Sequence, residues 1–195
     1  MSDPPLLSLV PEWQHDGEET IAETRIFTLR KRRATSPSRP DAPGEFVYLD
    51  SADWVNVIAV TPKQEVVLIE QYRHGTAEVT LEIPGGMVES GEDPLAAGVR
   101  ELAEETGFGS DEFELIGSVT PNPAILNNHC HTALVRNVTL RGPLGLDEHE
   151  EIGVRLVPLA AIADMIAEGH IHHALVVAAF HYLSLRGGAP GEGAL

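Results

Sequence analysis

Short apolar stretches, several of them alternating with polar residues, dominate the first two thirds of the chain. In ETRIFTLRKRR at 23–33, Ile26, Thr28 and Arg30 follow the two-residue period of a strand. Other apolar runs are bounded by turn residues, which favours buried strands. The predicted strands are 23–33, 45–50, 54–61, 65–73, 79–86, 114–124, 129–140 and 151–159.

Helical spacing predicts a helix over 94–106, and its ends carry the expected signals. Asp93 is suited to the N-cap, Pro94 to the first helical position, and Gly107 to the C-terminal stop. The predicted core face consists of Leu95, Val99, Leu102, Ala103 and Thr106. Two further helices are predicted at 159–171 and 172–185.

Gly98 lies inside the first of these helices, beside the predicted core face. A glycine in a helix interior costs ~1 kcal/mol relative to alanine. We therefore expect another part of the molecule to approach the helix closely at this residue.

Strands outnumber helices, and regular strand–helix–strand units are few. This favours a mixed α/β (α+β) sheet with helices packed on it and argues against a doubly wound nucleotide fold. Proline-rich or polar segments at 1–22 and 34–44 are expected to be a loosely ordered N-terminus and a loop, and 187–195 a flexible tail.

The chain carries 30 acidic and 13 basic residues, a formal net charge of −17, and six of the basic residues lie between Arg25 and Arg39. Such a charge argues against nucleic acid or an anionic membrane surface as a partner, because both would be repelled. A small phosphorylated ligand remains compatible with this charge if a divalent cation mediates the contact.

Cys130 is the single cysteine, so no intrachain disulfide can form, and it is expected to be a small buried hydrophobe. The N-terminal segment MSDPPLLSLVPEW lacks the basic region of a signal peptide, and no apolar run approaches the ~18 residues of a membrane span. These features predict a cytoplasmic protein without a membrane segment.

The segment GGMVESGEDPLAAGVRELAEETGF at 85–108 crowds Glu101, Glu104 and Glu105 onto one face of the predicted helix. Like charges at this spacing repel each other by ~0.2–0.5 kcal/mol per pair. Grouped carboxylates are the ligands that Mg²⁺ or Mn²⁺ prefers, and a bound dication would remove the repulsion. The alternative is a solvated acidic face with Glu–Lys pairs, but the helix offers Arg100 and no lysine.

The spacing is specific. Gly86 is followed after five residues by Glu92 and, after seven more, by RELAEETGF at 100–108. This pattern resembles the complete Nudix box of the Nudix hydrolases. The resemblance implies a Nudix-type mixed sheet sandwiched between helices. It also implies that metal is bound by Glu101, Glu105, the Gly85 carbonyl and, when more than one metal binds, Glu104.

The same resemblance assigns Arg100 and Glu104 to the catalytic apparatus, with Arg100 and Glu92 bracing the loop and orienting the carboxylates. Simple structural pairing of Arg100 and Glu92 is the alternative.

LEIPGG before the box and EQYRHG upstream are similar to the ADP-ribose pyrophosphatase and nucleoside-diphosphate-sugar hydrolase branch of this family. The similarity implies that Arg73 binds the diphosphate, which suits its planar fork, and that Glu82 accepts from sugar hydroxyls. A surface arginine and a strand-edge glutamate are the alternatives.

In that branch an acidic loop closes over the metals, and LDEHEEIGV at 146–154 matches it. The resemblance makes Glu148 a candidate general base and Glu150 a further metal ligand or an alternative base. Taken alone, such a loop is usually a solubilising surface. The loop at 120–131 offers Asn122 to the sugar pocket, unless it is a satisfied turn residue, and Trp54 either stacks on a base or packs in the core.

The resemblance divides the chain into a strand appendage at 23–50, which builds a homodimer, and a Nudix domain at 51–186. The implied activity is Mg²⁺-dependent hydrolysis of a nucleoside diphosphate linked to a sugar-like group, giving a nucleoside monophosphate and a sugar phosphate. Mn²⁺ is a possible substitute. A catalytically silent module that senses a nucleotide sugar is the alternative, although all acidic residues of the box are present.

Overall fold

The protein is described by a computed structural model covering residues 8–146, 148 and 150–187. It separates into two compact units. The N-terminal unit contains the described residues up to Ser51 together with Asn122–Asn127, and the central unit contains Ala52–Pro121 and the chain from Asn128 onwards. The predictions for residues 1–7 and for the tail from residue 188 lie outside the described residues.

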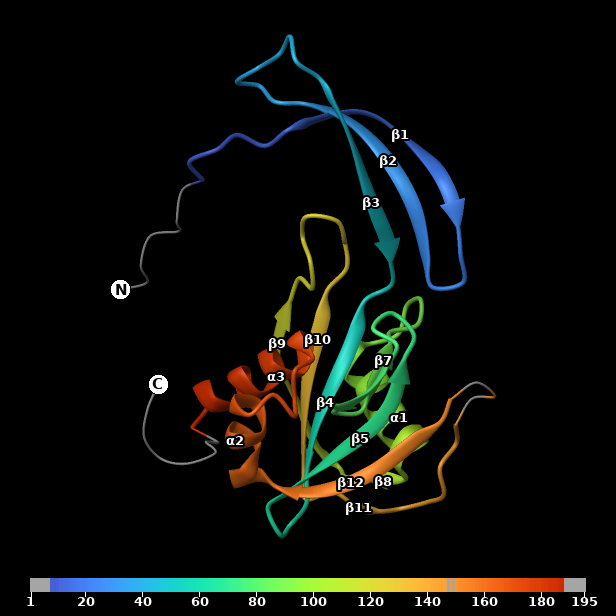
Figure 1. Cartoon of the computed structure of the whole chain (residues 1–195), viewed down its shortest axis with the longest axis vertical. Coiled ribbons are helices and arrows are strands. Elements are labelled where there is room, and N and C mark those ends of the chain that lie inside the picture. Colours follow the sequence, from blue (N-terminus) through green and yellow to red (C-terminus); the bar gives the residue numbers. More distant parts are fainter. Residues whose placement is uncertain (1–7, 147, 149, 188–195) are drawn as a thin grey trace. The chain divides into compact units, whose positions relative to one another are not determined.

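The N-terminal unit contains an antiparallel sheet in the order β1-β2-β3, formed by Gln14–Glu23, Phe27–Thr35 and Gly44–Ser51 (Figure 1). The structure differs here from the expectation of a loose segment up to residue 22. Opposite charges face each other across β1 and β2, with Glu18 paired to Arg32 and Glu19 to Lys31. Cross-strand pairs of this kind stabilise a sheet, and they order a strand whose residues are all exposed.

The central unit is built on a sheet in the order β12-β5-β4-β10-β9, with β6 paired to β5 and β7 to β4. β4 and β10 run parallel and the other pairs antiparallel, so the predicted mixed sheet is confirmed. Its strands are β4 (Trp54–Val60), β5 (Glu65–Arg73), β6 (Glu78–Glu82), β7 (Gly85–Met87), β9 (Glu112–Val119), β10 (Cys130–Arg136) and β12 (Ile152–Pro158). A small second sheet pairs β8 (Phe108–Gly109) with β11 (Thr139–Leu140).

Two predicted strands are divided in the structure. The stretch 79–86 becomes β6 and β7, because Pro84 interrupts the pairing. The stretch 129–140 becomes β10 and β11 on either side of Asn137, which has a φ of 53°. A residue in this left-handed region turns the chain and ends a strand.

Helices cover both faces of the central sheet (Figure 1). α1 (Pro94–Thr106) packs on one face, and α3 (Ala174–Leu185) and the short α2 (Ile162–Ala167) pack on the other. A 3₁₀ turn at Leu159–Ala161 precedes α2. The predicted helix 159–171 ends early because Gly169, with a φ of 78°, terminates it.

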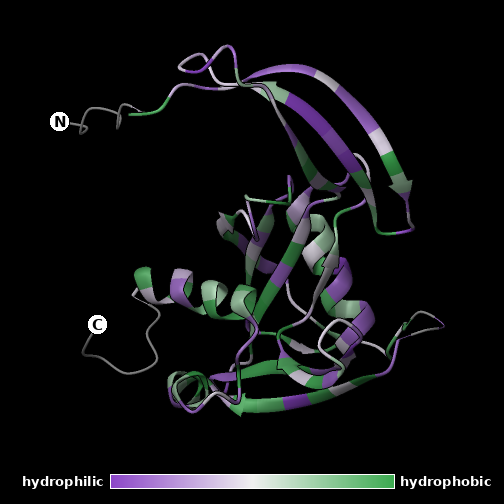
Figure 2. Cartoon of the chain, turned by 45° about the horizontal axis from the view of Figure 1, so that its top comes forward, coloured by the Kyte–Doolittle hydropathy of each residue, from purple (hydrophilic) through white to green (hydrophobic). Residues whose placement is uncertain are grey.

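Alternate residues of the central strands are buried on opposite faces of the sheet and form two hydrophobic clusters. Val55, Val57 and Ala59 of β4 face α1, whereas Ile58 and Val60 face α3. In Figure 2, which is coloured by hydropathy, hydrophobic residues lie along β4 and α3, whereas β1 and β2 carry long hydrophilic stretches. In the part of the chain that the structure describes, no helix has the length and apolar character needed to cross a membrane.

α1 has the predicted ends. The Asp93 carboxylate accepts from the backbone N–H groups of Leu95 and Ala96, and Gly107 adopts the left-handed conformation with a φ of 72°. The predicted core face is partly wrong. Ala103 is exposed, Leu95 and Val99 are half-buried, and the buried residues are Ala97, Gly98, Leu102, Glu105 and Thr106. The buried face is therefore turned towards Glu105, a polar residue that periodicity alone assigns to the outside.

The close approach predicted at Gly98 is confirmed. A Cβ atom there would lie 3.1–3.4 Å from side-chain atoms of Val55, Val57 and Ala133. α1 thus packs directly on β4 and β10, and this contact sets the distance of its acidic residues from the sheet.

Candidate active site

The turn between β6 and β7 brings backbone against the acidic face of α1. Gly85 and Gly86 pair with Asn56 and Val55 of β4. A Cβ on Gly85 would overlap the Val55 carbonyl oxygen, and a Cβ on Gly86 would overlap the carboxylate of Glu101. Only glycine at both positions leaves room for the strand and the carboxylate together.

Glu105 is the most buried carboxylate of this region, at 4% exposure. The backbone N–H of Gly85 donates to its Oε2 over 2.8 Å. Burial raises the pKa of Glu105 to about 8 although the Gly85 hydrogen bond lowers it, and the neighbouring charges of Glu101 and Glu150 add to the rise. Burial also raises the pKa of Glu101. These carboxyls are therefore crowded and short of positive charge.

Arg100 provides part of the missing charge. Its guanidinium donates to Glu92 from Nε and Nη2, both at 3.0 Å, and to the Met87 carbonyl. Its Nη1 donates to Glu101 at 2.9 Å and to Glu104 at 3.1 Å. One side chain thus ties the loop after β7 to two of the helix carboxylates.

The acidic loop before β12 is anchored on the last turn of α1. The backbone N–H groups of Arg141 and Gly142 donate to the Gly107 carbonyl, and that of Gly145 donates to the Glu104 carbonyl over 2.8 Å. Beyond this anchor, Glu150 lies close enough to Glu101 and Glu105 to raise their pKa values.

The loop carboxylates differ in their placement. The structure brings Glu150 to the helix carboxylates, whereas Glu148 is an exposed turn residue of the same loop. Asp147, which sequence reasoning counted in the acidic cluster of this loop, lies outside the described residues.

Arg73, at the end of β5, lies beside this cluster, since its charge lowers the pKa of Glu105. Its Nε and Nη2 donate to the two carboxylate oxygens of Glu82 over 2.7 and 2.6 Å. Glu82 is 2% exposed. Both oxygens of Glu82 therefore hold Arg73 in the structure, and the predicted role of Glu82 in accepting from sugar hydroxyls stays a prediction.

Asn122 and Trp54, the two other predicted substrate-binding residues, belong to different units of the chain. Asn122 belongs to the N-terminal unit, where its carbonyl accepts from the N–H groups of Ile125 and Leu126 and closes a turn. Trp54 is a half-buried residue at the start of β4, and its N–H donates to the His129 carbonyl.

The residues around α1 suit a divalent cation. Glu101, Glu104, Glu105 and Glu150 and the Gly85 carbonyl offer oxygen donors only, the ligand type that Mg²⁺ and Mn²⁺ prefer. Burial raises the pKa values of Glu101 and Glu105, and a bound cation would favour their ionised forms. Within the described residues no three carboxylate, imidazole or thiol groups already enclose a common point. Glu101 and Glu104 would have to turn from Arg100 to do so.

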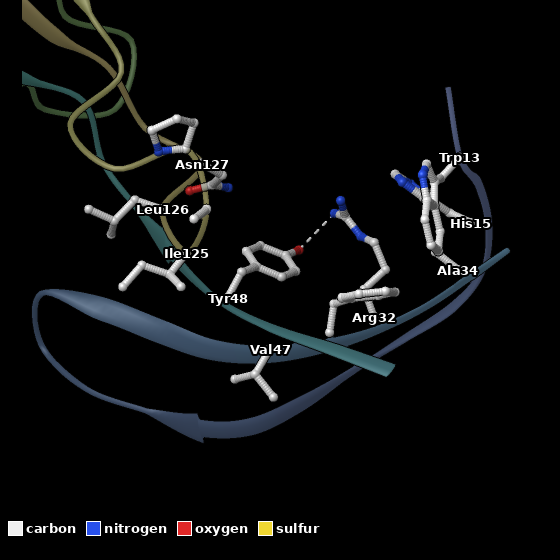
Figure 3. Close-up of a pocket in the computed structure, with 12 residues that line it drawn as sticks. Trp13, His15, Arg32, Ala34, Val47, Tyr48, Ile125, Leu126 and Asn127 are labelled. Atoms are coloured by element: carbon white, nitrogen blue, oxygen red, sulfur yellow. Dashed lines mark hydrogen bonds between the residues drawn. The ribbon is translucent and has the colours of Figure 1, made fainter. Parts of the chain in front are cut away.

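The N-terminal unit contains a cavity of about 450 Å³ that was not predicted from the sequence. Figure 3 shows Arg32 and Tyr48 facing each other, with Nη2 of Arg32 donating to the Tyr48 hydroxyl over 2.9 Å. Trp13 meets Phe46 edge to face at 5.3 Å. The remaining lining is His15, Ala34, Val47 and 123–127.

The lining of this cavity suits a flat, largely apolar group. The one signal in the sequence was the aromatic alternation Phe46–Tyr48, but Trp13 lies in a segment that was predicted to be loose.

Comparison with known proteins agrees with this geometry. Residues 50–180 match the model of the NUDIX domain. The chain is 31% identical over 169 residues to the methanol dehydrogenase activator of Bacillus methanolicus, covering 86% of this chain and 90% of that protein. It is 29% identical over 175 residues to an ADP-ribose pyrophosphatase of Bacillus subtilis, covering 87% and 94%.

The fold is also found among solved structures. The crystal structure of an ADP compounds hydrolase superposes with a TM-score of 0.80 at 20% identity, covering 95% of this chain and all of that one. This likeness confirms the predicted fold class. From the domain match and the similarity over most of its length, the chain belongs to the NUDIX domain family of hydrolases.

Proposed function

We propose that this Nudix hydrolase cleaves the pyrophosphate bond of ADP-ribose or of a related nucleoside diphosphate sugar. ADP-ribose would give AMP and ribose 5-phosphate. A similar Bacillus subtilis protein is named for ADP-ribose, and the structural neighbour for ADP compounds. The observation that carries the proposal is the placement of the Arg73 guanidinium beside the buried carboxyl of Glu105.

This arrangement suits a pyrophosphate because it offers two kinds of positive charge. Enzymes of this family generally use divalent metal ions, and we propose Mg²⁺ here, with Mn²⁺ as a substitute, held by Glu101, Glu104, Glu105, Glu150 and the Gly85 carbonyl. The ion would polarise a phosphoryl oxygen and lower the pKa of a bound water. Arg73 would hold the diphosphate in place with its planar fork.

A carboxylate must also take the proton of the attacking water. Glu150 is the better placed of the two loop candidates, because it lies close to Glu101 and Glu105. Glu148, three residues after the end of the anchored segment 141–145, is the alternative. Arg100 would orient the carboxylates of Glu101 and Glu104 by hydrogen bonding to both.

A coupled assay tests the proposal. Phosphate is measured after phosphatase treatment of ADP-ribose incubated with the protein, with and without Mg²⁺, because phosphatase acts on the products and not on the intact diphosphate. Glu105→Gln should lower turnover by orders of magnitude. Glu168→Gln, at an exposed glutamate after α2, is the matched control and should leave it unchanged.

The alternative of a silent sensing module predicts a different outcome. Such a module would bind ADP-ribose tightly and release no product with either metal. The complete set of carboxylates around α1, including the buried Glu105, favours the enzyme, since a sensor has no need of them.

We further propose that the N-terminal unit, with the predicted appendage at 23–50, forms a homodimer. Large apolar side chains on its sheet are about half exposed, among them Ile21, Phe46 and Val47. Exposed large apolar side chains on a sheet of this kind favour an interaction site. A cytoplasmic location is also proposed, because a chain whose single cysteine is free and buried fits a reducing compartment.

A further inference from the structure

Thr80, on β6, is linked to Arg73 indirectly, because it hydrogen-bonds the carboxylate that holds Arg73. Its hydroxyl donates to Oε1 of Glu82 over 2.6 Å, whereas the other acceptor bonded to it among the described residues, the Gln71 carbonyl, is 3.4 Å away. Thr80 is 5% exposed. A hydroxyl has a single proton, so in this buried position it is committed to the Glu82 carboxylate.

Glu82, whose orientation the Thr80 hydrogen bond restrains, in turn restrains Arg73. The oxygen that accepts from Thr80, Oε1, also accepts from Nε of Arg73 over 2.7 Å, while Oε2 accepts from Nη2 over 2.6 Å. Two parallel hydrogen bonds hold the guanidinium in the plane of the carboxylate. The plane of the carboxylate is fixed in turn by the Thr80 hydroxyl.

Without this support the Arg73 side chain would be free to move. It comes from the last residue of β5, and its side chain is 44% exposed. Among the described residues, Nη1 donates to no partner, and the guanidinium lies close enough to Glu105 to lower its pKa. The edge left free is thus available to a ligand beside the carboxylates.

Two other groups could in principle orient Glu82. His173 lies on the far side, with Nδ1 4.0 Å from Oε2, beyond hydrogen-bond distance, and that nitrogen has no hydrogen-bond partner. His172 contacts Glu78 instead. Thr80 is therefore the group other than Arg73 that sets the carboxylate plane.

We propose that Thr80 is a positioning residue for the reaction: through Glu82 it fixes the guanidinium of Arg73 in the plane that receives the pyrophosphate. The inference rests on the proposed function, since it takes Arg73 to bind that group. It assigns no contact with substrate to Thr80 itself.

The test compares three variants of the full-length protein. Thr80→Val removes the hydroxyl at nearly constant shape, and Thr80→Ser restores it. Thr61→Val is the matched control, because Thr61 is another buried threonine, 6% exposed, whose hydroxyl accepts from the turn between β4 and β5, at the opposite end of β5 from Arg73. Circular dichroism checks that each variant is folded.

Two readouts are measured. The first is hydrogen exchange of the Arg73 Nε–H by ¹⁵N NMR in the absence of substrate. The second is kcat and KM for ADP-ribose with saturating Mg²⁺. Arg73 would hold the diphosphate in both ground and transition states, so Thr80→Val should raise KM by about 10-fold, equivalent to ~1.4 kcal/mol, with little change in kcat. Exchange of the Arg73 proton should accelerate in the same variant.

Thr80→Ser should recover both values, and Thr61→Val should change neither, although it lowers the melting temperature. Unchanged exchange and unchanged KM in Thr80→Val would overturn the inference. If the wild-type protein hydrolyses no nucleoside diphosphate sugar, the proposed function fails, and the exchange measurement still decides whether Thr80 orders Arg73.

Discussion

At the scale of single residues, Glu105 shows the conflict between folding and function most clearly. Its carboxyl is buried against the Gly85 N–H, close to Glu101 and Glu150, and its pKa rises to about 8 through burial. A carboxyl that prefers to be neutral is costly to ionise in the folded state. At neutral pH the ionised Glu105 therefore lowers the stability of the metal-free protein, and a bound cation would restore it.

This cost has a definite pH dependence. In the folded protein the pKa of Glu105 lies above its ordinary value of 4.5, so the folded state binds the proton more tightly between about pH 4.5 and 8. Stability is then highest at low pH within this window and is lost as pH rises through it. In EDTA, the melting temperature of the wild type should fall from pH 5 to pH 8 relative to that of Glu105→Gln.

Adding Mg²⁺ at pH 8 should restore the melting temperature of the wild type and leave that of Glu105→Gln nearly unchanged. Parallel melting curves for the two proteins across the whole range in EDTA would show that burial of this carboxyl carries no such cost.

Gly85 and Gly86 provide a matched pair of substitutions. A Cβ on Gly86 would meet the end of the Glu101 side chain, which can swing away, whereas one on Gly85 would meet the β4 backbone, which cannot. Gly86→Ala should therefore weaken Mg²⁺ binding with a small loss of stability, and Gly85→Ala should destabilise the fold. Calorimetric metal titration and urea denaturation measure the two effects. Equal stability losses in both variants would contradict this reading.

At the scale of elements, α1 connects packing to chemistry. Its glycine at position 98 lets the helix pack directly on β4 and β10, and the residues that follow in the next turn include Arg100 and Glu101. The height of the carboxylates above the sheet thus depends on a contact on the buried side of the helix.

Gly98→Ala tests this dependence. Alanine gains ~1 kcal/mol of helix propensity, but its methyl would lie 3.1–3.4 Å from Val55, Val57 and Ala133 in the central strands. Overpacking of a rigid core costs about 1–3 kcal/mol. We expect the free energy of unfolding to fall by about 1 kcal/mol in chemical denaturation, net of both effects. The exposed Ala103→Gly reports propensity alone, and a Gly98→Ala protein more stable than wild type would refute the close packing.

The same helix shows how far sequence reasoning reaches. Asp93, Pro94 and Gly107 mark its ends by local hydrogen bonding, which depends on neighbouring residues alone, and these were predicted correctly. Its buried face was assigned wrongly because periodicity treats every glutamate as exposed. Glu105 turns inward because Gly85, twenty residues away, donates to it.

Contacts of this range limited the site prediction as well. The cluster on the helix follows from spacing, but the pairing of Glu82 with Arg73 depends on the register of β5 against β6. The cavity around Trp13 and Tyr48 depends on chain segments more than 70 residues apart along the sequence, from His15 to Asn127.

At the scale of the whole molecule, the chain divides its charge and its chemistry between two units. Arg30, Lys31 and Arg32 of β2 form ion pairs with acids of β1 and β3, which compensates most of the basic charge of this strand within the sheet. The central unit holds the carboxylates, Arg73 and Arg100. The proposed homodimer is placed on the N-terminal sheet because large apolar side chains are exposed there.

Deleting residues 1–44 should therefore reduce the mass measured by light scattering to that of one chain, because it removes β1 and β2 and with them the proposed dimer surface. Deleting residues 188–195, at the other terminus, is the control and should leave the mass unchanged. A full-length protein that already has the mass of a single chain would disprove the homodimer.

The anchoring of Gly145 on the Glu104 carbonyl, and of Arg141 and Gly142 on that of Gly107, has a consequence for protein engineering. Loop and helix share backbone hydrogen bonds, so the root of the acidic loop is tied to the helix that carries the other carboxylates. Transplanting the loop alone into a related scaffold would break this alignment, whereas residues 94–107 and 141–150 exchanged as one cassette would carry their mutual geometry with them.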